Sequence, residues 1–169
     1  MKLTRSILLL SLGLAISACS TNPNLIGNGA SGAAGSGAFE QGSPSDPTSI
    51  AYFNQTVGDR VLFEVDQSTL TDAARTVLEG QAQFLLANTE YTALIEGHAD
   101  EQGTREYNLA LGERRANAAR EYLVSRGVAG NRIQTISYGK ERPLEICSNE
   151  TCYAKNRRAV TVLASNVTS

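Results

Sequence analysis

The chain has 169 residues, of which 41% are hydrophobic and 19% charged, enough for one ordinary core and some additional segments. Its formal net charge of -2 gives no electrostatic case for binding nucleic acid. A single histidine excludes most histidine-based metal centres.

The N-terminus has the pattern of a secretory signal. A basic start precedes an apolar stretch over residues 7–16 that is too short to span a bilayer and leads into small residues. The sequence ISAC at 16–19 resembles the lipobox of bacterial lipoproteins, so we expect a signal peptide over 1–18 and lipidation at Cys19. Several acyl chains on one residue would hold the chain firmly in a membrane. By the same resemblance, Ser20 after the cysteine favours the outer membrane over the inner one. The alternative to a lipoprotein signal is an ordinary secretory signal that ends near a cysteine by chance.

Residues 19–49 are rich in Gly, Ser, Ala, Asn and Pro and contain almost no apolar side chains to bury. We expect a disordered linker, which as a coil of this length would span about 30 Å. A tether between membrane and domain is the functional interpretation, and a tolerated tail is the alternative. The folded domain is expected over 50–169.

Cys147 and Cys152 remain as a pair in an oxidising compartment, which predicts a disulfide. The closed ring is small, so the bond would stabilise the fold by about 2 kcal/mol and stiffen one loop. A redox pair would prefer a CxxC spacing, and a metal site would need more ligands nearby.

Hydrophobic periodicity predicts strands alternating with helices, in the order β-α-β-α-β-loop-β. Strands alternating with helices indicate βαβ units packed on one mixed sheet. A short helix is expected first, and the longer elements are a strand over 58–66, a helix over 69–88, a strand over 89–98, a helix over 104–126, and strands over 131–140 and 157–165.

The ends and faces of these elements can also be predicted. Thr71 is a plausible N-cap of the first long helix, and Gly127 is placed to end the second. The first strand alternates Val61, Phe63 and Val65. The inner stripe of the first long helix is Leu70, Ala74, Val77, Leu78 and Leu85.

The stretch around the single histidine admits a metal interpretation. Glu96, His98 and Asp100 alternate and would share one face of a continuing strand. Glycines at 97 and 103 indicate that the strand ends here, and no second histidine completes a ligand shell. We therefore expect no metal and place His98 at the end of a strand.

An enzymatic interpretation is also weak. The acidic residues Asp66, Glu96, Asp100 and Glu101 provide carboxylates, but nothing in the sequence fixes a pair at a useful distance. No nucleophile elbow is present, and one histidine is the only candidate base. We expect no enzyme.

A non-covalent binding site is the third interpretation. Asn108 and Arg115 fall on one helical face, while Asp100 follows the second strand, at an edge where open α/β sheets bind ligands. Arg115 could bind a carboxylate through two N–H groups and Asp100 an ammonium, which together match an α-amino acid group. From spacing alone, a simple Asp100–Arg115 salt bridge is the favoured alternative.

Several motifs in order resemble one known family. They are GDRVLFEVD at 58–66, GHADEQGTREYNLALGERRA at 97–116, ISYGKERP at 136–143 and NRRAV at 156–160. They are similar to the OmpA-like peptidoglycan-binding domain, over about residues 57 to 163. The resemblance implies an α+β or α/β sandwich of βαβαβ-β order, with a mixed four-stranded sheet and helices packed on it, and no cofactor.

The resemblance also implies a ligand, diaminopimelate in the stem peptide of peptidoglycan. Asp100 would take its ammonium, Arg115 its carboxylate, and Asn108 would support the pocket. Ala99 stands where many members have Thr, so a hydrogen bond there must come from the backbone. Arg157 and Arg158 are expected to be structural or rim residues at a solvated strand start. The implied ligand-binding residues are Asp100, Arg115, Asn108, Ala99, Val65 and Asp66.

The partners implied by the resemblance are peptidoglycan, the outer membrane through the lipid, and the β-propeller protein of the Tol system. The resulting expectation is a tether between outer membrane and cell wall that serves envelope integrity and constriction during division. Two alternatives remain: another OmpA-like lipoprotein outside the Tol system, and a surface adhesin or enzyme accessory lipoprotein.

Overall fold

The structure is a computed structural model that describes residues 42–146 and 148–165. The signal peptide expected over 1–18, the expected lipidation site Cys19 and the expected disulfide partner Cys147 lie outside the described residues. Cys152 is disulfide-bonded, but its pairing with Cys147 stays a prediction.

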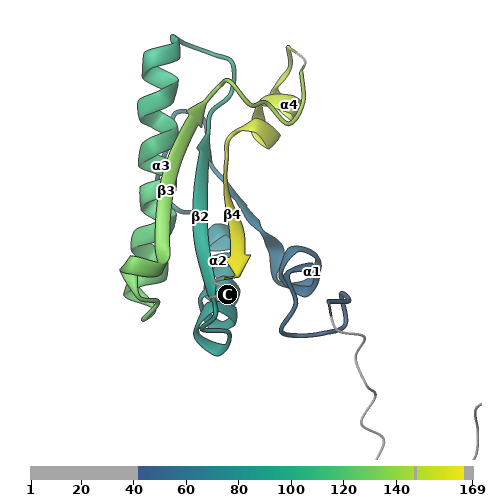
Figure 1. The fold of residues 1–169 in the computed structure, drawn as a ribbon. Helices are drawn as coiled ribbons and strands as arrows, with labels where there is room; N and C mark the ends of the chain where they lie inside the picture. The colour runs from purple at the N-terminus through teal and green to yellow at the C-terminus, as the bar shows by residue number, and fades with distance from the viewer. Residues whose placement is uncertain (1–41, 147, 166–169) are drawn as a thin grey trace, which may run out of the picture. The chain divides into compact units, whose positions relative to one another are not determined.

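Helices and strands alternate along the described chain in the expected order (Figure 1). Two helices dominate, α2 (Asp72–Ala87) and α3 (Arg105–Ser125). The strands are β1 (Arg60–Leu62), β2 (Tyr91–His98), β3 (Ile133–Gly139) and β4 (Arg158–Ser165). The short elements are α1 (Ile50–Tyr52), the π-helix η1 (Phe53–Gly58), the 3-10 helix η2 (Gly130–Arg132) and α4 (Glu150–Asn156).

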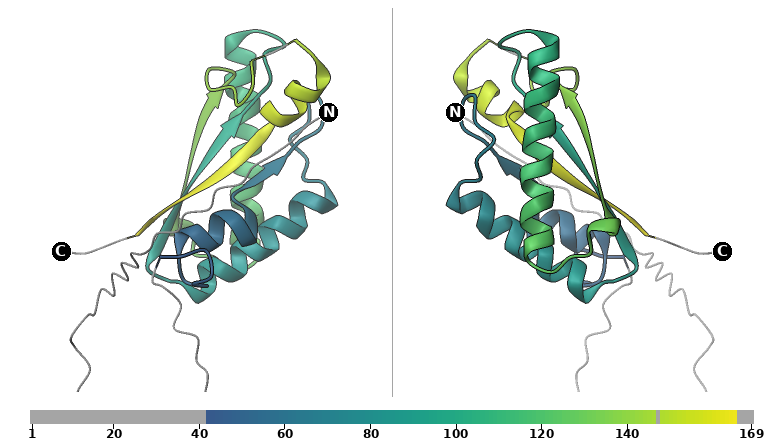
Figure 2. Two further views of the ribbon diagram at one scale, coloured as in Figure 1. Left: turned by 90° about the vertical axis from the view of Figure 1, so that its right-hand side faces the viewer. Right: turned by 90° about the vertical axis from the view of Figure 1, so that its left-hand side faces the viewer.

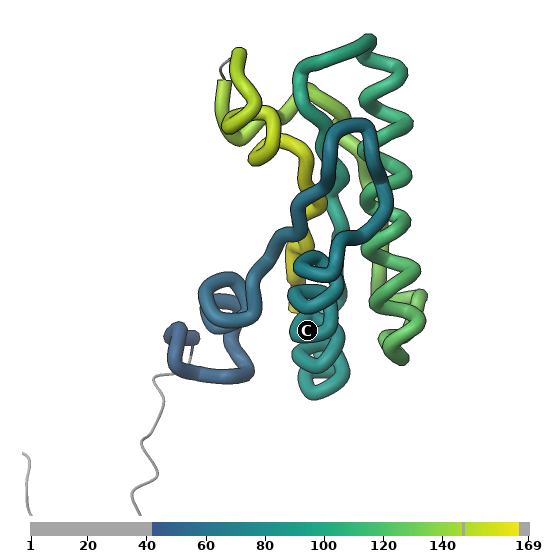
Figure 3. The backbone as a smooth tube through the Cα atoms, turned by 180° about the vertical axis from the view of Figure 1, so that it is seen from behind, coloured from purple at the N-terminus to yellow at the C-terminus, as the bar shows by residue number. Residues whose placement is uncertain are grey.

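The strands form one mixed sheet in the order β1-β4-β2-β3, which confirms the predicted four-stranded sheet. β2 and β3 are parallel, and β4 runs antiparallel to both β1 and β2. Helices α2 and α3 cover the same face of this sheet (Figures 2 and 3). The loops that follow β1 and β2 therefore leave the sheet at one end, near the start of α3.

The helix ends and the core follow the sequence pattern. The Thr71 side chain caps α2 by accepting from the Ala74 N–H, and Thr104 caps α3 in the same way. Gly127 follows α3 with a φ of 100°, a left-handed conformation that glycine adopts without steric cost. The expected inner stripe of α2 is buried at Ala74, Leu78 and Leu85, with Leu70 and Val77 packed against the core.

The first strand is shorter than the sequence predicted. β1 ends at Leu62; Phe63 remains buried, but Val65 is 52% exposed instead of facing the core. Asp66 has a φ of 56°, which is incompatible with an extended strand, and the Gln67 N–H bonds back to the Glu64 carbonyl at 3.2 Å. A tight turn over 64–67 thus replaces the predicted end of the strand.

Two other expectations need correction. The segment before β4 was expected to be a loop, but it contains α4, whose first turn is capped by the Asn149 side chain accepting from the Cys152 N–H. Arg157 and Arg158 were expected to be structural or rim residues at a solvated strand start. The solvated rim position is wrong, since both are buried; their guanidinium groups bond to side chains and carbonyls of neighbouring loops, as structural residues do.

The last part of the segment assigned to the linker forms hydrogen-bonded turns. Asp46 accepts hydrogen bonds from the backbone of Gly42 and Thr48, and both Asp46 and Ser49 are buried. Ser49 also caps α1 by accepting from the Tyr52 N–H. Packing against the domain therefore begins before residue 50.

Strand β2 and helix α3 touch through two glycines. A Cβ placed on Gly97 would overlap the Gly112 carbonyl, and a Cβ on Gly112 would overlap the Ser137 hydroxyl and lie 2.8 Å from the Gly97 carbonyl oxygen. The absence of side chains at both positions lets the helix backbone lie directly on the strand. This contact sets the height of α3 above the sheet.

Replacing Gly112 by alanine should therefore destabilise the fold. The gain in helix propensity is about 1 kcal/mol, but forcing extra volume into such a contact typically costs about 1–3 kcal/mol and more where backbone must move. Gly80→Ala in α2 is the matched control, because its Cβ would only reach Val57 at 3.4 Å. Urea unfolding should show that Gly112→Ala is less stable than wild type and that Gly80→Ala is not. An equal loss of stability in the two variants would contradict the close-contact explanation.

His98 ends β2, as expected, and is buried at 2% exposure. Its ring lies 5.7 Å from the ring of Tyr138 in β3. Burial, followed by the positive charges of Arg158 and Arg142, lowers the pKa of His98 to about 4. The imidazole is therefore neutral at physiological pH.

This shifted pKa predicts a loss of stability in mild acid. Histidine in an unfolded chain has a pKa of about 6.5, so the unfolded chain takes up the proton first. The contribution of neutral His98 to the free energy of unfolding is therefore complete above about pH 6.5, and it is lost as the pH falls towards 4. Between about pH 7 and about pH 5, wild type should lose about 2 kcal/mol more than His98→Gln in urea unfolding. Parallel pH profiles for the two proteins would refute the buried neutral state.

Candidate functional site

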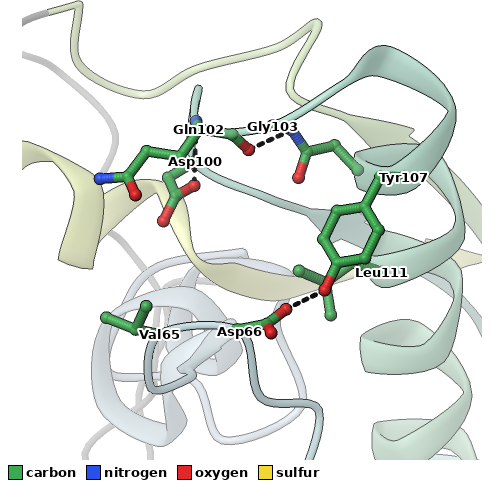
Figure 4. Close-up of a pocket in the computed structure, with 8 residues that line it drawn as sticks. Val65, Asp66, Asp100, Gln102, Gly103, Tyr107 and Leu111 are labelled. Carbon is green, nitrogen blue, oxygen red and sulfur yellow. Dashed lines mark hydrogen bonds between the residues drawn. The ribbon is translucent and has the colours of Figure 1, made fainter.

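A pocket of about 320 Å³ lies where the loops after β1 and β2 meet the first turns of α3 (Figure 4). Its walls combine carboxylates, amides, a phenol and aliphatic side chains. The lining residues are Val65, Asp66, Asp100, Gln102, Gly103, Tyr107, Asn108 and Leu111. The pocket thus brings together four of the predicted site residues, from three separate segments of the sequence.

Asp100 lies in the loop after β2 and is 8% exposed. Its Oδ1 accepts from the Gln102 N–H at 3.2 Å, and its Oδ2 accepts from Nη1 of Arg157 at 3.2 Å. The ion pair of Asp100 is therefore with Arg157, and the alternative Asp100–Arg115 salt bridge is not formed. Both oxygens are fixed, which orients the carboxylate at the pocket wall.

Arg157 connects this carboxylate to two other parts of the fold. It is 3% exposed, and its Nε donates to the Phe63 carbonyl at 3.2 Å. Its Nη2 donates to Glu150 in the first turn of α4. Arg157 thus joins the end of β1, the loop after β2 and α4 behind the pocket.

Asn108 is 1% exposed on the face of α3 that lines the pocket. Its Nδ2 donates to the Gln102 carbonyl at 2.8 Å and so holds the loop after β2. Its Oδ1 is buried and accepts no hydrogen bond from any residue that the structure describes. An unsatisfied buried acceptor costs free energy, so this oxygen is suited to an N–H donor from a ligand.

The opposite wall is formed by Val65, Asp66 and Tyr107. The Tyr107 side chain extends from α3 towards Asp66, and its hydroxyl donates to the Asp66 carboxylate (Figure 4). This hydrogen bond raises the pKa of Tyr107 above its usual value of 10.0. The phenol is therefore protonated and able to donate at neutral pH.

Arg115 lies beneath the pocket and does not line it. Its side chain has no exposed surface, and its guanidinium donates to the carbonyls of Gln67 at 2.8 Å, His98 at 2.9 Å and Glu64 at 3.2 Å. Burial lowers the pKa of Arg115 to about 10, against the opposing effect of the Asp100 charge, so the group remains positively charged. The predicted contact with a ligand carboxylate is not tested by this arrangement.

Ala99 also lies off the pocket lining. It is 2% exposed, and its N–H donates to the Gly139 carbonyl at 2.8 Å, where it continues the pairing of β2 with β3. The backbone N–H of Ala99 is therefore occupied by the sheet, and the predicted role of Ala99 in ligand binding stays a prediction.

Tyr107, Gln102 and the Asp100–Arg157 pair were not among the site residues predicted from the sequence. A sequence signal existed for Tyr107, because Tyr107, Leu111 and Arg115 recur at i, i+4 and i+8 and so share one stripe of a helix. The Arg157 pairing had no such signal, because Asp100 and Arg157 are far apart in the sequence.

Other classes of site find no support in the described ranges. No group of three or more His, Cys, Asp or Glu side chains there is arranged to hold a metal ion. Glu96 and His98 approach each other, with Oε2 and Nε2 3.7 Å apart, but Asp100 is bonded to Arg157 instead. None of the described helices combines the length and the hydrophobicity needed to cross a bilayer.

Comparison with known proteins identifies the domain. The model of the OmpA family matches residues 62–157. The peptidoglycan-associated lipoprotein of Rhizobium meliloti is 50% identical over 154 residues, which cover 91% of this chain and 84% of that protein. The peptidoglycan-associated lipoprotein of Haemophilus influenzae is 37% identical over 160 residues, 94% of this chain and 97% of that protein.

Solved structures agree with this assignment. The crystal structure of the peptidoglycan-associated lipoprotein from Burkholderia pseudomallei matches with a TM-score of 0.64 and 36% identity, over 72% of this chain and 98% of that one. The C-terminal domain of Helicobacter pylori MotB shares the fold, with a TM-score of 0.60 and 19% identity over 64% of this chain and 86% of that one. The chain belongs to the OmpA family.

Proposed function

We propose that this protein is an outer-membrane lipoprotein that tethers the membrane to the cell wall. Lipid on Cys19 would hold the chain in the outer membrane, and the segment before the domain would give it reach into the periplasm. The domain would bind the diaminopimelate residue of the peptidoglycan stem peptide without covalent chemistry. The signal-like N-terminus and the names of the relatives support this proposal.

The observation that carries the proposal is the set of acceptors in the pocket. Asp66, Asp100 and Asn108 all line the pocket, and Oδ1 of Asn108 is a buried acceptor without a partner among the described residues. An ammonium group has three N–H donors and a positive charge, so it can bond to carboxylate and amide oxygens. The free end of diaminopimelate carries such an ammonium beside a carboxylate.

Arg115 supplies the complementary charge for the ligand's carboxylate. Its guanidinium is shielded from water beneath the pocket, where a charge acts more strongly than it does at the surface. We propose that it acts on the carboxylate through this field and through the position that it gives to the loop over 64–67. A direct bidentate contact would require that loop to release the guanidinium.

Each single contact can be weak in this mechanism. Many lipid-anchored copies would face one continuous polymer, and simultaneous binding raises the overall avidity without any new contact. A moderate affinity per domain also lets individual domains release the wall.

We also propose that the protein acts in the Tol system, in envelope integrity and constriction during division, and that the β-propeller protein of that system competes with peptidoglycan. This part follows from the family resemblance. The alternative is another OmpA-like wall-binding lipoprotein outside the Tol system.

Calorimetry with a diaminopimelate-containing stem peptide tests the pocket. Asp100→Asn should weaken binding by at least about 1 kcal/mol, since it removes a charge that faces the ligand's ammonium and leaves Arg157 with Glu150 as its one remaining carboxylate partner. Glu101→Gln is the matched control, because Glu101 is the exposed neighbour outside the lining and loses the same charge. Equal affinities for Asp100→Asn and Glu101→Gln would remove Asp100 from the site.

Arg115→Lys completes the same test. It keeps the positive charge but cannot reach three carbonyls with the geometry of a guanidinium, so the loop over 64–67 should loosen. We expect lower stability in urea unfolding together with weaker peptide binding.

A wild-type protein that shows no heat of binding with this peptide would overturn the proposed function itself.

Competition with the propeller protein separates the two versions of the function. If the protein belongs to the Tol system, it should bind the purified β-propeller protein of its own organism, and excess stem peptide should release it. In a pull-down, binding that the peptide abolishes would support the Tol assignment. The absence of binding would favour a wall-binding lipoprotein outside that system.

A further inference from the structure

The turn over 64–67, which carries Asp66, is held by one stripe of α3. Arg115 donates to the carbonyls of Glu64 and Gln67, on either side of the turn, at 3.2 and 2.8 Å. Two turns earlier on the same stripe, Tyr107 donates to the Asp66 side chain. The helix therefore fixes both the backbone and the carboxylate of this loop.

Asp66 occupies an unusual conformation for a residue that is not glycine. Its φ of 56° is the only positive value among the non-glycine residues that the structure describes. Its side chain is exposed at the pocket wall, where a carboxylate without a partner would rotate freely. Strained residues of this kind persist where surrounding contacts hold them, and they are concentrated at functional sites.

We propose that Tyr107 is a positioning residue for ligand recognition, whose hydroxyl fixes the Asp66 carboxylate as a second contact for the ligand's ammonium. This inference rests on the proposed function, because it concerns the same pocket. The hydroxyl occupies Oδ1 of Asp66 and leaves the lone pairs of Oδ2 for the ligand. Tyr107 itself need not touch the ligand.

The electrostatic surroundings are consistent with this role. The guanidinium of Arg114 lies 6.0 Å from the Tyr107 ring centre, and the charge of Arg115 lies beneath the same wall. Both positive charges favour an ionised phenol, but the hydrogen bond to Asp66 dominates and raises the pKa of Tyr107. The hydroxyl therefore remains a donor across the physiological pH range.

Fixing the Asp66 carboxylate before the ligand binds should increase the affinity for the ligand. Without the hydroxyl, the carboxylate has to be ordered when the ligand arrives, and part of the binding free energy is lost in ordering it. The cost of ordering one side chain on binding predicts a roughly twofold to tenfold weaker affinity for Tyr107→Phe. The phenyl ring retains its packing, so the fold should keep its stability.

A double-mutant cycle tests this role. Calorimetry with the diaminopimelate-containing stem peptide would use the full-length protein in detergent, as wild type, Tyr107→Phe, Asp66→Gly and the double variant. Glycine at 66 removes the carboxylate and accepts the positive φ. Tyr122→Phe is the matched control, because Tyr122 also lies in α3 and its hydroxyl also bonds to a carboxylate, that of Glu79, away from the pocket.

If Tyr107 acts through Asp66, Tyr107→Phe should weaken binding in the wild-type background and leave the affinity of Asp66→Gly unchanged. Tyr122→Phe should bind as wild type. An equal loss in both backgrounds, or no loss in either, would overturn the positioning role while the proposed function stands. Failure of wild type to bind the peptide would overturn both.

A second measurement needs no ligand. In a protein with ¹³C at the tyrosine Cζ atoms, NMR titration should show the pKa of Tyr107 falling towards its usual value in Asp66→Gly, because the hydrogen bond that raises it is gone. An unchanged pKa would show that the Tyr107–Asp66 bond is not formed in solution, and would overturn the inference independently of peptide binding.

Discussion

The guanidinium group of Arg115 is the interaction on which the pocket depends. It joins the turn after β1, the end of β2 and helix α3 by donating to two carbonyls of that turn and to one at the strand end. The Arg115 side chain has no exposed surface, and a buried charge without these hydrogen bonds would be costly. A lysine has a single nitrogen and cannot span the same three positions. The geometry of the pocket therefore follows from one buried planar cation.

The close contact of Gly97 with Gly112 makes this reach possible. Because neither residue has a side chain, α3 lies directly on β2, and the next turn of the helix brings Arg115 under the strand end at His98. The pocket then opens one turn further towards the start of the helix, at Asn108 and Tyr107. The glycine contact between the sheet and α3 thus positions Arg115, and Arg115 in turn positions the turn at the pocket wall.

Local signals were sufficient for most of the fold. The cap at Thr71 and the alternation of strands with helices follow from neighbouring residues, and the structure has both as expected. The end of β1 was missed because the pattern of Val61, Phe63 and Val65 continues past Leu62, while carbonyl contacts from a distant arginine hold the turn. Periodicity cannot detect a contact of this kind. The same reason explains Arg157, whose partners Asp100 and Glu150 come from separate segments.

The charged residues of the candidate site lie in two layers. Asp66 and Asp100 line the pocket, whereas Arg115 and Arg157 lie behind it, buried and bonded to backbone or carboxylate. A pocket with carboxylates in front and arginines behind would present acceptors to the ammonium of the proposed ligand, while the ligand's carboxylate would still lie in a positive field. Sequence spacing suggested an anion and a cation side by side at the surface. The fold instead places them in two layers, so the arginines determine where the carboxylates stand.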